Sequence, residues 1–151
     1  MTGTGFTRRQ ALLAGAAFVL GAGTGPGTAR ATNGWQAALS AFTDGLQPVA
    51  SGITLDLPEI AENGNMVPMT IRVESPMTPD DHVAEVIVIA TDNPEPEVSR
   101  FRFTPLAGRA EVVTRIRLAR SQEVIAAARM ADGSTRIDRR QVSVIVGGCG
   151  A

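Results

Sequence analysis

The sequence contains few of the residues on which most protein chemistry depends. Among its 151 residues there is one cysteine, one histidine and one tryptophan, and there is neither tyrosine nor lysine. A single cysteine excludes an intramolecular disulfide. The motifs CxxC, HExxH, Gly-x-Ser-x-Gly and a Gly-rich phosphate loop are all missing, and a metal site needs three or four converging ligands. We therefore expect no catalytic residue, no metal and no cofactor.

Long apolar runs are also missing from the body of the chain. No stretch of 18 or more apolar residues follows the first 31 residues, which excludes a typical transmembrane helix there. The length corresponds to one domain, and a domain of this size buries more than half of the surface of its unfolded chain. A core without disulfides is therefore expected.

The first 31 residues resemble a twin-arginine export signal. Arg8 and Arg9 precede a mildly apolar stretch, 11–20, and Ala29-Arg30-Ala31 has the A-x-A pattern of a cleavage site. An uncleaved amphipathic helix is the alternative. Cleavage would remove three of the 14 basic residues and none of the 15 acids, leaving a formal charge of −4. This balance argues against nucleic-acid binding, and the signal predicts a periplasmic protein with no membrane attachment after cleavage.

Residues 32–146 have the pattern of a β-sandwich domain with a short leading helix. Thr32 or Asn33 is expected to cap a helix from Trp35 to Asp44, with Trp35 anchoring it to the body. The period of apolar residues then changes from 3.6 to 2. Residues 58–65 are expected to form a turn-rich connection, and Pro68 suggests an edge position or a bulge. About seven strands follow from the pattern, at residues 53–57, 67–73, 83–90, 98–103, 111–118, 122–130 and 141–146.

These strands predict an all-β fold, an antiparallel β-sandwich. Turn signals separate the strands every 8 to 14 residues, and Asp132-Gly133 is a hairpin signal. The order of the strands in the sheets does not follow from the pattern. The lone His82 is expected to be a solvated loop residue, and the face that carries Arg115 and Arg117 is either solvated or a docking face.

The only cysteine lies near the carboxy terminus, in Gly147-Gly148-Cys149-Gly150-Ala151. We call residues 147–151 the arm. Three glycines leave Cys149 unshielded, and five extended residues reach roughly 17 Å. Cys149 is therefore either an accidental or dimer-forming thiol, or a covalent carrier that partner enzymes modify; the positions of lipidated cysteines do not fit. The carrier interpretation makes Cys149 the attachment site and Gly147, Gly148 and Gly150 a flexible arm.

Several segments in order resemble the SoxY family, the sulfur-carrier subunits of the Sox thiosulfate-oxidising system. One departure is Ala151, where the family usually ends in a second glycine. The resemblance extends from the export signal to the last residue and is carried by 58–64 (PEIAENG), 74–77 (ESPM), 93–96 (NPEP), 114–119 (TRIRLA), 132–133 (DG) and 147–150 (GGCG).

The resemblance implies an immunoglobulin-like sandwich, a periplasmic heterodimer with the companion subunit SoxZ, and sulfur intermediates held on Cys149. It further implies three partner enzymes: a c-type cytochrome that couples thiosulfate to the thiol, a metal-dependent hydrolase that releases sulfate, and a sulfane dehydrogenase. The alternative is a structural or adhesive sandwich module that uses Cys149 only for an intermolecular disulfide.

Overall fold

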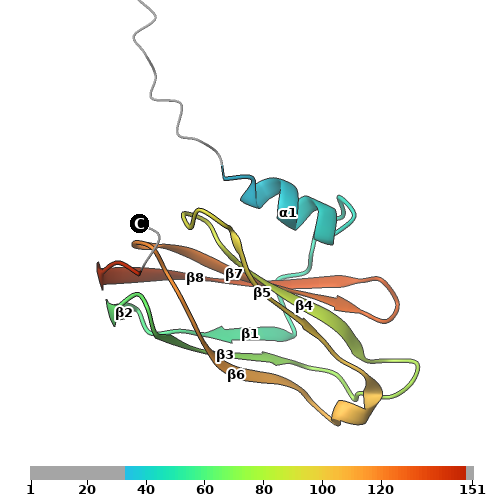
Figure 1. Cartoon of the computed structure of the whole chain (residues 1–151). Helices are drawn as coiled ribbons and strands as arrows, with labels where there is room; N and C mark the ends of the chain where they lie inside the picture. The colour runs from blue at the N-terminus through green and yellow to red at the C-terminus, as the bar shows by residue number, and fades with distance from the viewer. Residues whose placement is uncertain (1–32, 149–151) are drawn as a thin grey trace, which may run out of the picture. The chain divides into compact units, whose positions relative to one another are not determined.

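The chain folds into a two-sheet β-sandwich with one α-helix on its outside (Figure 1). The computed structural model describes residues 33–148, so the predicted export signal, Thr32 and residues 149–151 lie outside the described part. Within residues 33–148 the elements are α1 (Trp35–Phe42), β1 (Ile53–Asp56), β2 (Ile60–Asn63), β3 (Val67–Val73), β4 (Val83–Ala90), β5 (Glu97–Arg102), the 3-10 helix η2 (Pro105–Ala107), β6 (Ala110–Ile116), β7 (Gln122–Met130) and β8 (Thr135–Val146).

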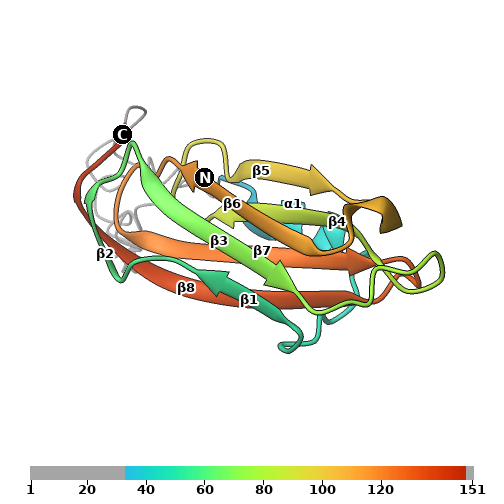
Figure 2. The ribbon, with the colours of Figure 1, turned by 90° about the horizontal axis from the view of Figure 1, so that it is seen from below.

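The strands form two sheets that face each other. One has the order β1-β3-β6, and the other has the order β2-β8-β7-β4-β5. In Figure 2, β1, β3 and β6 lie in front of β7 and β8, which is the two-layer arrangement of a sandwich. All pairings between these strands are antiparallel except that of β2 with β8, which is parallel. The predicted all-β, immunoglobulin-like sandwich with a short helix is confirmed.

Inward-facing apolar side chains from both sheets make the main core. β3 shows the alternation directly. Val67, Met69, Ile71 and Val73 are buried, whereas the three residues between them are exposed or half-buried. β4 and β7 differ, since they are covered on both faces and have long buried runs. Their double burial explains why the 83–90 segment reads as an apolar run instead of an alternating one.

α1 covers the outer face of the five-stranded sheet. Its apolar residues recur at helical spacing, as the sequence predicts. Two guanidinium groups approach the ring of Phe42: the Cζ atom of Arg129 lies 4.8 Å from the ring centroid and that of Arg100 lies 5.9 Å from it. The second core contains Phe42 with Ile87, Ile89, Ile125, Ala127 and Ile137, and Trp35, Ala38 and Leu39 pack against it.

The start of α1 is one residue away from the predicted cap. Gly34 occupies the N-cap position and has no side chain to cap the helix, but the side-chain oxygen of Asn33 accepts the amide of Trp35 (3.3 Å), the first helical residue. The side-chain nitrogen of Asn33 also donates hydrogen bonds to the carbonyls of Thr91 (2.8 Å) and Asn93 (2.6 Å), so Asn33 ties the start of the domain to the β4–β5 turn. α1 is too short to cross a membrane, and residues 33–148 contain no helix that meets the length and apolarity needed for that.

Two segments near the end of the sandwich form strands beyond the predicted ones. The expected connection at 58–65 contains β2, of which only Ala61 points into the core. β8 begins at Thr135, six residues before the predicted start, because its first half pairs with β7 from Thr135 to Val142. Pro68 lies in the middle strand of its sheet, but β1 pairs with β3 only from Thr70 onward, so β3 is locally an edge there.

Candidate functional site

The end of β8 leads into Gly147 and Gly148, the first two residues of the arm. β8 has β7 on one side and β2 on the other, and its pairing with β2 extends to Val146. Gly147 is exposed, but Gly148 is buried. Figures 1 and 2 both show the end of β8 beside β2. The strand that leads into the arm is therefore held between two neighbours.

A set of backbone hydrogen bonds fixes this point, and we call it the clasp. The amide of Gly64, in the β2–β3 turn, donates to the carbonyl of Val146 (2.8 Å). The amide of Leu118, after β6, donates to the carbonyl of Gly64 (2.8 Å), and the amide of Gly148 donates to the carbonyl of Leu118 (2.9 Å). The clasp thus joins three segments far apart in sequence and holds the arm at Gly148.

The clasp leaves no room for a side chain at Gly64 and little room at Gly148. A Cβ atom on Gly64 would lie 2.2 Å from the carbonyl oxygen of Leu118 and 2.8 Å from the amide nitrogen of Gly148. A Cβ atom on Gly148 would lie 3.1 Å from the carbonyl oxygens of Gly64 and Leu118, a tight contact that a shift of a few tenths of an ångström would relieve. Close approach of the three backbones therefore requires glycine at Gly64 and favours it at Gly148.

The side chain of Asn93 holds the segment that supplies Leu118. Asn93 is 8% exposed. Its amide nitrogen donates to the carbonyl of Arg117 (2.9 Å), and its carbonyl oxygen accepts from the amide of Ala119 (2.9 Å) and from Gln122 (2.8 Å). Since Arg117 and Ala119 flank Leu118, Asn93 positions the carbonyl that receives the amide of Gly148.

The structure describes two of the four predicted site residues. Cys149 and Gly150 lie outside the described residues. Gly147 and Gly148 lie among them, at the end of β8, and Gly148 is bound to the body by the clasp. Gly64, Leu118 and Asn93 belong to the site but were not assigned to it from the sequence.

Residues 33–148 contain no group of three or more His, Cys, Asp or Glu side chains arranged to hold a metal ion. His82 lies before β4, and its Nδ1 is 3.1 Å from the carbonyl oxygen of Thr78.

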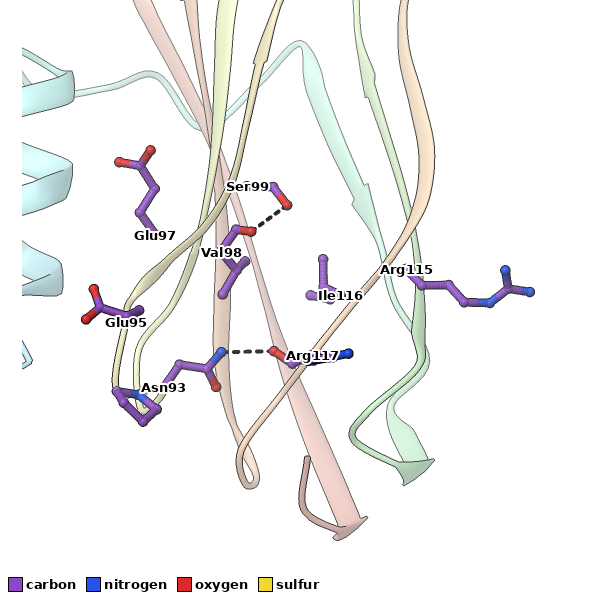
Figure 3. A pocket seen from close by; sticks show the side chains of 9 residues that line it. Asn93, Glu95, Glu97, Val98, Ser99, Arg115, Ile116 and Arg117 are labelled. Atoms are coloured by element: carbon purple, nitrogen blue, oxygen red, sulfur yellow. Dashed lines mark hydrogen bonds between the residues drawn. The ribbon is translucent and has the colours of Figure 1, made fainter. Parts of the chain in front are cut away.

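A pocket of about 510 Å³ lies between the edge strands β5 and β6 (Figure 3). The carboxylates of Glu95 and Glu97 point to one side of it and the guanidinium of Arg115 points to the other. Ser99 donates to the carbonyl of Val98 (2.7 Å), so its hydroxyl is already used. The charged groups do not converge in this pocket, and it has no arrangement for catalysis.

The clearest shifted pKa values belong to an ion-pair network on β4 and β5. Hydrogen bonds from Arg100 hold the pKa of Glu97 below its usual range, against the opposing effect of burial. Arg100 also contacts Glu85 (3.1 Å), and both carboxylates raise its pKa. Because Arg100 also lies over Phe42, this network supports α1 and is not part of the site.

Comparisons with known proteins show which folds and which family the chain is similar to. The sulfur carrier protein SoxY from Chlorobium limicola f thiosulfatophilum is similar at 27% identity and a TM-score of 0.57, over 72% of this chain and 94% of that chain. A superoxide reductase (neelaredoxin) from Ignicoccus hospitalis has 14% identity and a TM-score of 0.56, over 62% of this chain and 80% of that chain. A likeness at so low an identity shows a shared fold alone. No curated protein sequence matches the chain.

The family described as sulfur oxidation protein SoxY matches residues 39–149. This range contains all eight strands, the segments of the clasp, Asn93 and, as its last residue, Cys149. The chain therefore belongs to the SoxY family.

Proposed function

We propose that this protein carries sulfur covalently on Cys149 during the oxidation of thiosulfate. The observation that carries the proposal is that the family match ends at Cys149, the residue directly after the clasped Gly148. The similarity at 27% identity to a protein named as a sulfur carrier supports the same role.

Loading of the carrier is an oxidation. The Cys149 thiol and thiosulfate lose two electrons and one proton and form a sulfur–sulfur bond, which gives cysteine S-thiosulfonate. A c-type cytochrome, as a separate enzyme, accepts the electrons. A metal-dependent hydrolase then adds water across the bond to the terminal sulfonate, which releases sulfate and leaves a cysteine persulfide.

Two further steps return the thiol. A sulfane dehydrogenase oxidises the outer sulfur of the persulfide with three waters, removing six electrons and leaving cysteine S-sulfonate. A second hydrolysis releases sulfate and restores the Cys149 thiol. Transfer of the outer sulfur to another acceptor is the alternative to that oxidation.

A covalent carrier suits this substrate. Thiosulfate is a small, well hydrated dianion with little apolar surface for an enzyme to bind. A tether keeps each intermediate from diffusing away, and flexible tethers give effective concentrations of roughly millimolar. Each enzyme then needs to recognise only the arm and the surface around its base.

The partner and the location belong to the same proposal. We expect a heterodimer with the companion subunit SoxZ in the periplasm, because the family resemblance and the Arg8-Arg9 signal both point there. Replacement of Arg8 and Arg9 by lysine should leave the precursor in the cytoplasm. Periplasmic recovery of that variant at the wild-type level would contradict export by the twin-arginine route.

Mass spectrometry of the intact mature protein tests the carrier role. After incubation with thiosulfate and the coupling cytochrome, the wild type should gain the mass of one thiosulfate group, and Cys149→Ser should gain none while keeping its fold and its partner. An adduct on Cys149→Ser would overturn the assignment. The disulfide alternative predicts a different result, namely loss of function when a reductant separates a Cys149-linked dimer.

A further inference from the structure

Three arginine side chains beside the clasp have no partner among residues 33–148. Seven of the eleven arginines in this range form ion pairs with carboxylates. Arg136 instead donates to the carbonyls of Gly52 (3.2 Å) and Glu74 (2.6 Å). The remaining three guanidinium groups belong to exposed residues and form neither an ion pair nor a hydrogen bond within the described chain. They are those of Arg115, Arg117 and Arg120.

Unpaired positive charge is unexpected in this chain. Removal of residues 1–31 leaves 11 arginines against 15 acidic residues, so carboxylates are in excess. Even so, the three free guanidinium groups lie within one short segment, 115–120, which contains the end of β6 and most of its connection to β7. Grouped positive charge without counter-charges creates a local positive potential that attracts anions. An anion from outside residues 33–148 is therefore the expected partner of this segment.

Backbone contacts place this segment beside the start of the arm. Arg117 and Arg120 flank Leu118, whose carbonyl accepts the amide of Gly148 (2.9 Å). Ser121, next to Arg120, accepts the amide of Val144 with its hydroxyl oxygen (2.8 Å). Figure 1 likewise shows the connection from β6 to β7 close to the end of β8. Standard bond lengths then limit the distance from the Cα of Gly148 to roughly 11 Å for the Cα of Arg117 and roughly 14 Å for that of Arg120.

Covalent geometry brings a group carried on Cys149 within reach of both arginines. Cys149 directly follows Gly148, so its sulfur lies within roughly 7 Å of the Cα of Gly148. The three further bonds of an S-thiosulfonate extend this range to roughly 11 Å for the terminal oxygens. An extended arginine side chain places its guanidinium roughly 7 Å from its own Cα. Contact is therefore possible while the clasp stays closed.

The chemistry of the carried group matches these side chains. A sulfonate has a negative charge and three acceptor oxygens, whereas an empty thiol has neither. The rigid fork of a guanidinium binds oxyanions of this shape through paired, charge-assisted hydrogen bonds. Glu59 and Glu62, by contrast, lie on the β2 side of β8, are exposed and belong to no ion pair within the described chain. The charges on the two sides of β8 therefore direct an anion toward the arginines.

We propose that Arg117 and Arg120 bind the terminal sulfonate of the group carried on Cys149 and so hold the loaded arm against the clasp, while Arg115 adds to the local positive potential. The proposal rests on the function proposed above and adds the residues that recognise the cargo. Another anion that the chain keeps near these arginines is the terminal carboxylate of Ala151. That carboxylate is present in the empty and the loaded carrier alike, which lets an experiment separate the two.

The first test compares two chemical adducts of the mature protein with its companion subunit. Tetrathionate reacts with the Cys149 thiolate to form the S-thiosulfonate and releases thiosulfate, which takes the electrons of the broken sulfur–sulfur bond. Methyl methanethiosulfonate forms a neutral methylthio adduct instead and releases methanesulfinate. In NMR spectra of protein labelled with ¹⁵N-arginine, the Nε–H signals of Arg117 and Arg120 should move on reaction with tetrathionate only. Those of Arg102 and Arg109 should stay in place with both reagents.

The second test uses matched charge variants. Arg117→Gln/Arg120→Gln removes the proposed anion site, and Arg102→Gln/Arg109→Gln makes the same change in net charge at side chains that are 82% and 81% exposed. Arg102 and Arg109 lie on either side of η2, which Figure 1 shows at the end of the sandwich opposite to the end of β8. All four positions are exposed, so both variants should fold.

The quantity measured is the rate of reaction with tetrathionate divided by the rate with methyl methanethiosulfonate. Division by the rate of the neutral reagent removes any change in the reactivity of the thiol itself. At low ionic strength this ratio should fall at least about fivefold for Arg117→Gln/Arg120→Gln and less than about twofold for the control, because tetrathionate is a dianion. In about 1 M salt, where the screening length is about 3 Å, the difference should disappear.

The other outcomes overturn the proposal. Nε–H signals of Arg117 and Arg120 that ignore tetrathionate, or that respond equally to the neutral adduct, would show that these arginines do not bind the sulfonate, and the carrier function would stand. A rate ratio within about twofold of the wild type would do the same. Loss of the companion subunit from Arg117→Gln/Arg120→Gln alone in analytical ultracentrifugation would assign the arginines to that contact. Failure of the carrier function looks different: the wild type would react with tetrathionate but gain no adduct from thiosulfate and the coupling cytochrome, and this inference would fall with it.

Discussion

Replacement of Gly64 by alanine should open the clasp. Its new Cβ would lie 2.2 Å from the carbonyl oxygen of Leu118, which forces the β2–β3 turn and the segment after β6 apart. Two or three of the clasp hydrogen bonds would be lost, each with a net contribution of about 0.5–1.5 kcal/mol. Alanine also reduces the conformational entropy of the unfolded chain, which offsets about 0.4–1 kcal/mol of this loss of stability. We expect Gly64→Ala to lower the free energy of unfolding by about 1–3 kcal/mol.

Hydrogen exchange measured residue by residue locates the loss. In the wild type, the amides of Gly64, Leu118 and Gly148 are all hydrogen-bond donors and should exchange slowly. In Gly64→Ala they should exchange much faster, while the amides of β4 and β7 keep their protection relative to global unfolding. A urea titration gives the total change in the free energy of unfolding.

Gly108→Ala is the control for this prediction. Gly108 has a φ of +70° and open space around its Cβ position. Alanine there costs about 1–2 kcal/mol of backbone strain but should leave exchange at Leu118 and Gly148 unchanged. If Gly64→Ala leaves both the stability and the exchange of the Gly148 amide at wild-type values, the clasp does not hold the arm as described.

Three further predictions concern the supports of the site and the helix. Asn93→Ala removes three side-chain hydrogen bonds, two of them buried, and should lower the free energy of unfolding by about 2–4 kcal/mol in a urea titration. A loss below about 0.5 kcal/mol would refute the role of Asn93. Glu97→Gln should cost less than about 1 kcal/mol at neutral pH. Because Arg100 lowers the pKa of Glu97, this contribution is present above the unfolded-state pKa and is lost as pH falls through the folded-state pKa, so the stabilities of the two proteins should converge in acid; a difference that persists or grows as the pH is lowered would contradict this. Phe42→Ala should cost about 3–5 kcal/mol and shift the emission of Trp35, the only tryptophan, to longer wavelength as α1 loosens; unchanged emission would show that α1 does not depend on Phe42.

The strands that carry an apolar alternation could be predicted from the sequence. β3 alternates over seven residues, and the Asp132-Gly133 turn predicts the β7–β8 hairpin, in which Gly133 has a φ of +85°. β2 has no such signal, because only one of its four residues is buried. Its strand conformation comes from parallel pairing with β8, a contact between segments about 80 residues apart. No local pattern carries that information.

Only the part of the candidate site that has a local sequence signal could be predicted. The arm glycines stand out because they surround the only cysteine. Gly64, Asn93 and Leu118 lie in segments that carry the family resemblance, yet nothing local shows that they meet. Gly148 is an example. The sequence indicates a glycine that makes the arm flexible, whereas in the structure this glycine also allows close contact with Gly64 and Leu118.

The position of β8 between two neighbours bears on how the domain withstands tension. If Cys149 carries sulfur as proposed, a partner enzyme that withdraws from it pulls on the end of β8 through Gly148. Such a load acts in shear on the ladder to β7 and on the ladder to β2 at once, so many hydrogen bonds must stretch together before any breaks. A terminal strand at the edge of a sheet would peel away one bond at a time. A pull on the arm should therefore move the whole domain before β8 separates from its neighbours.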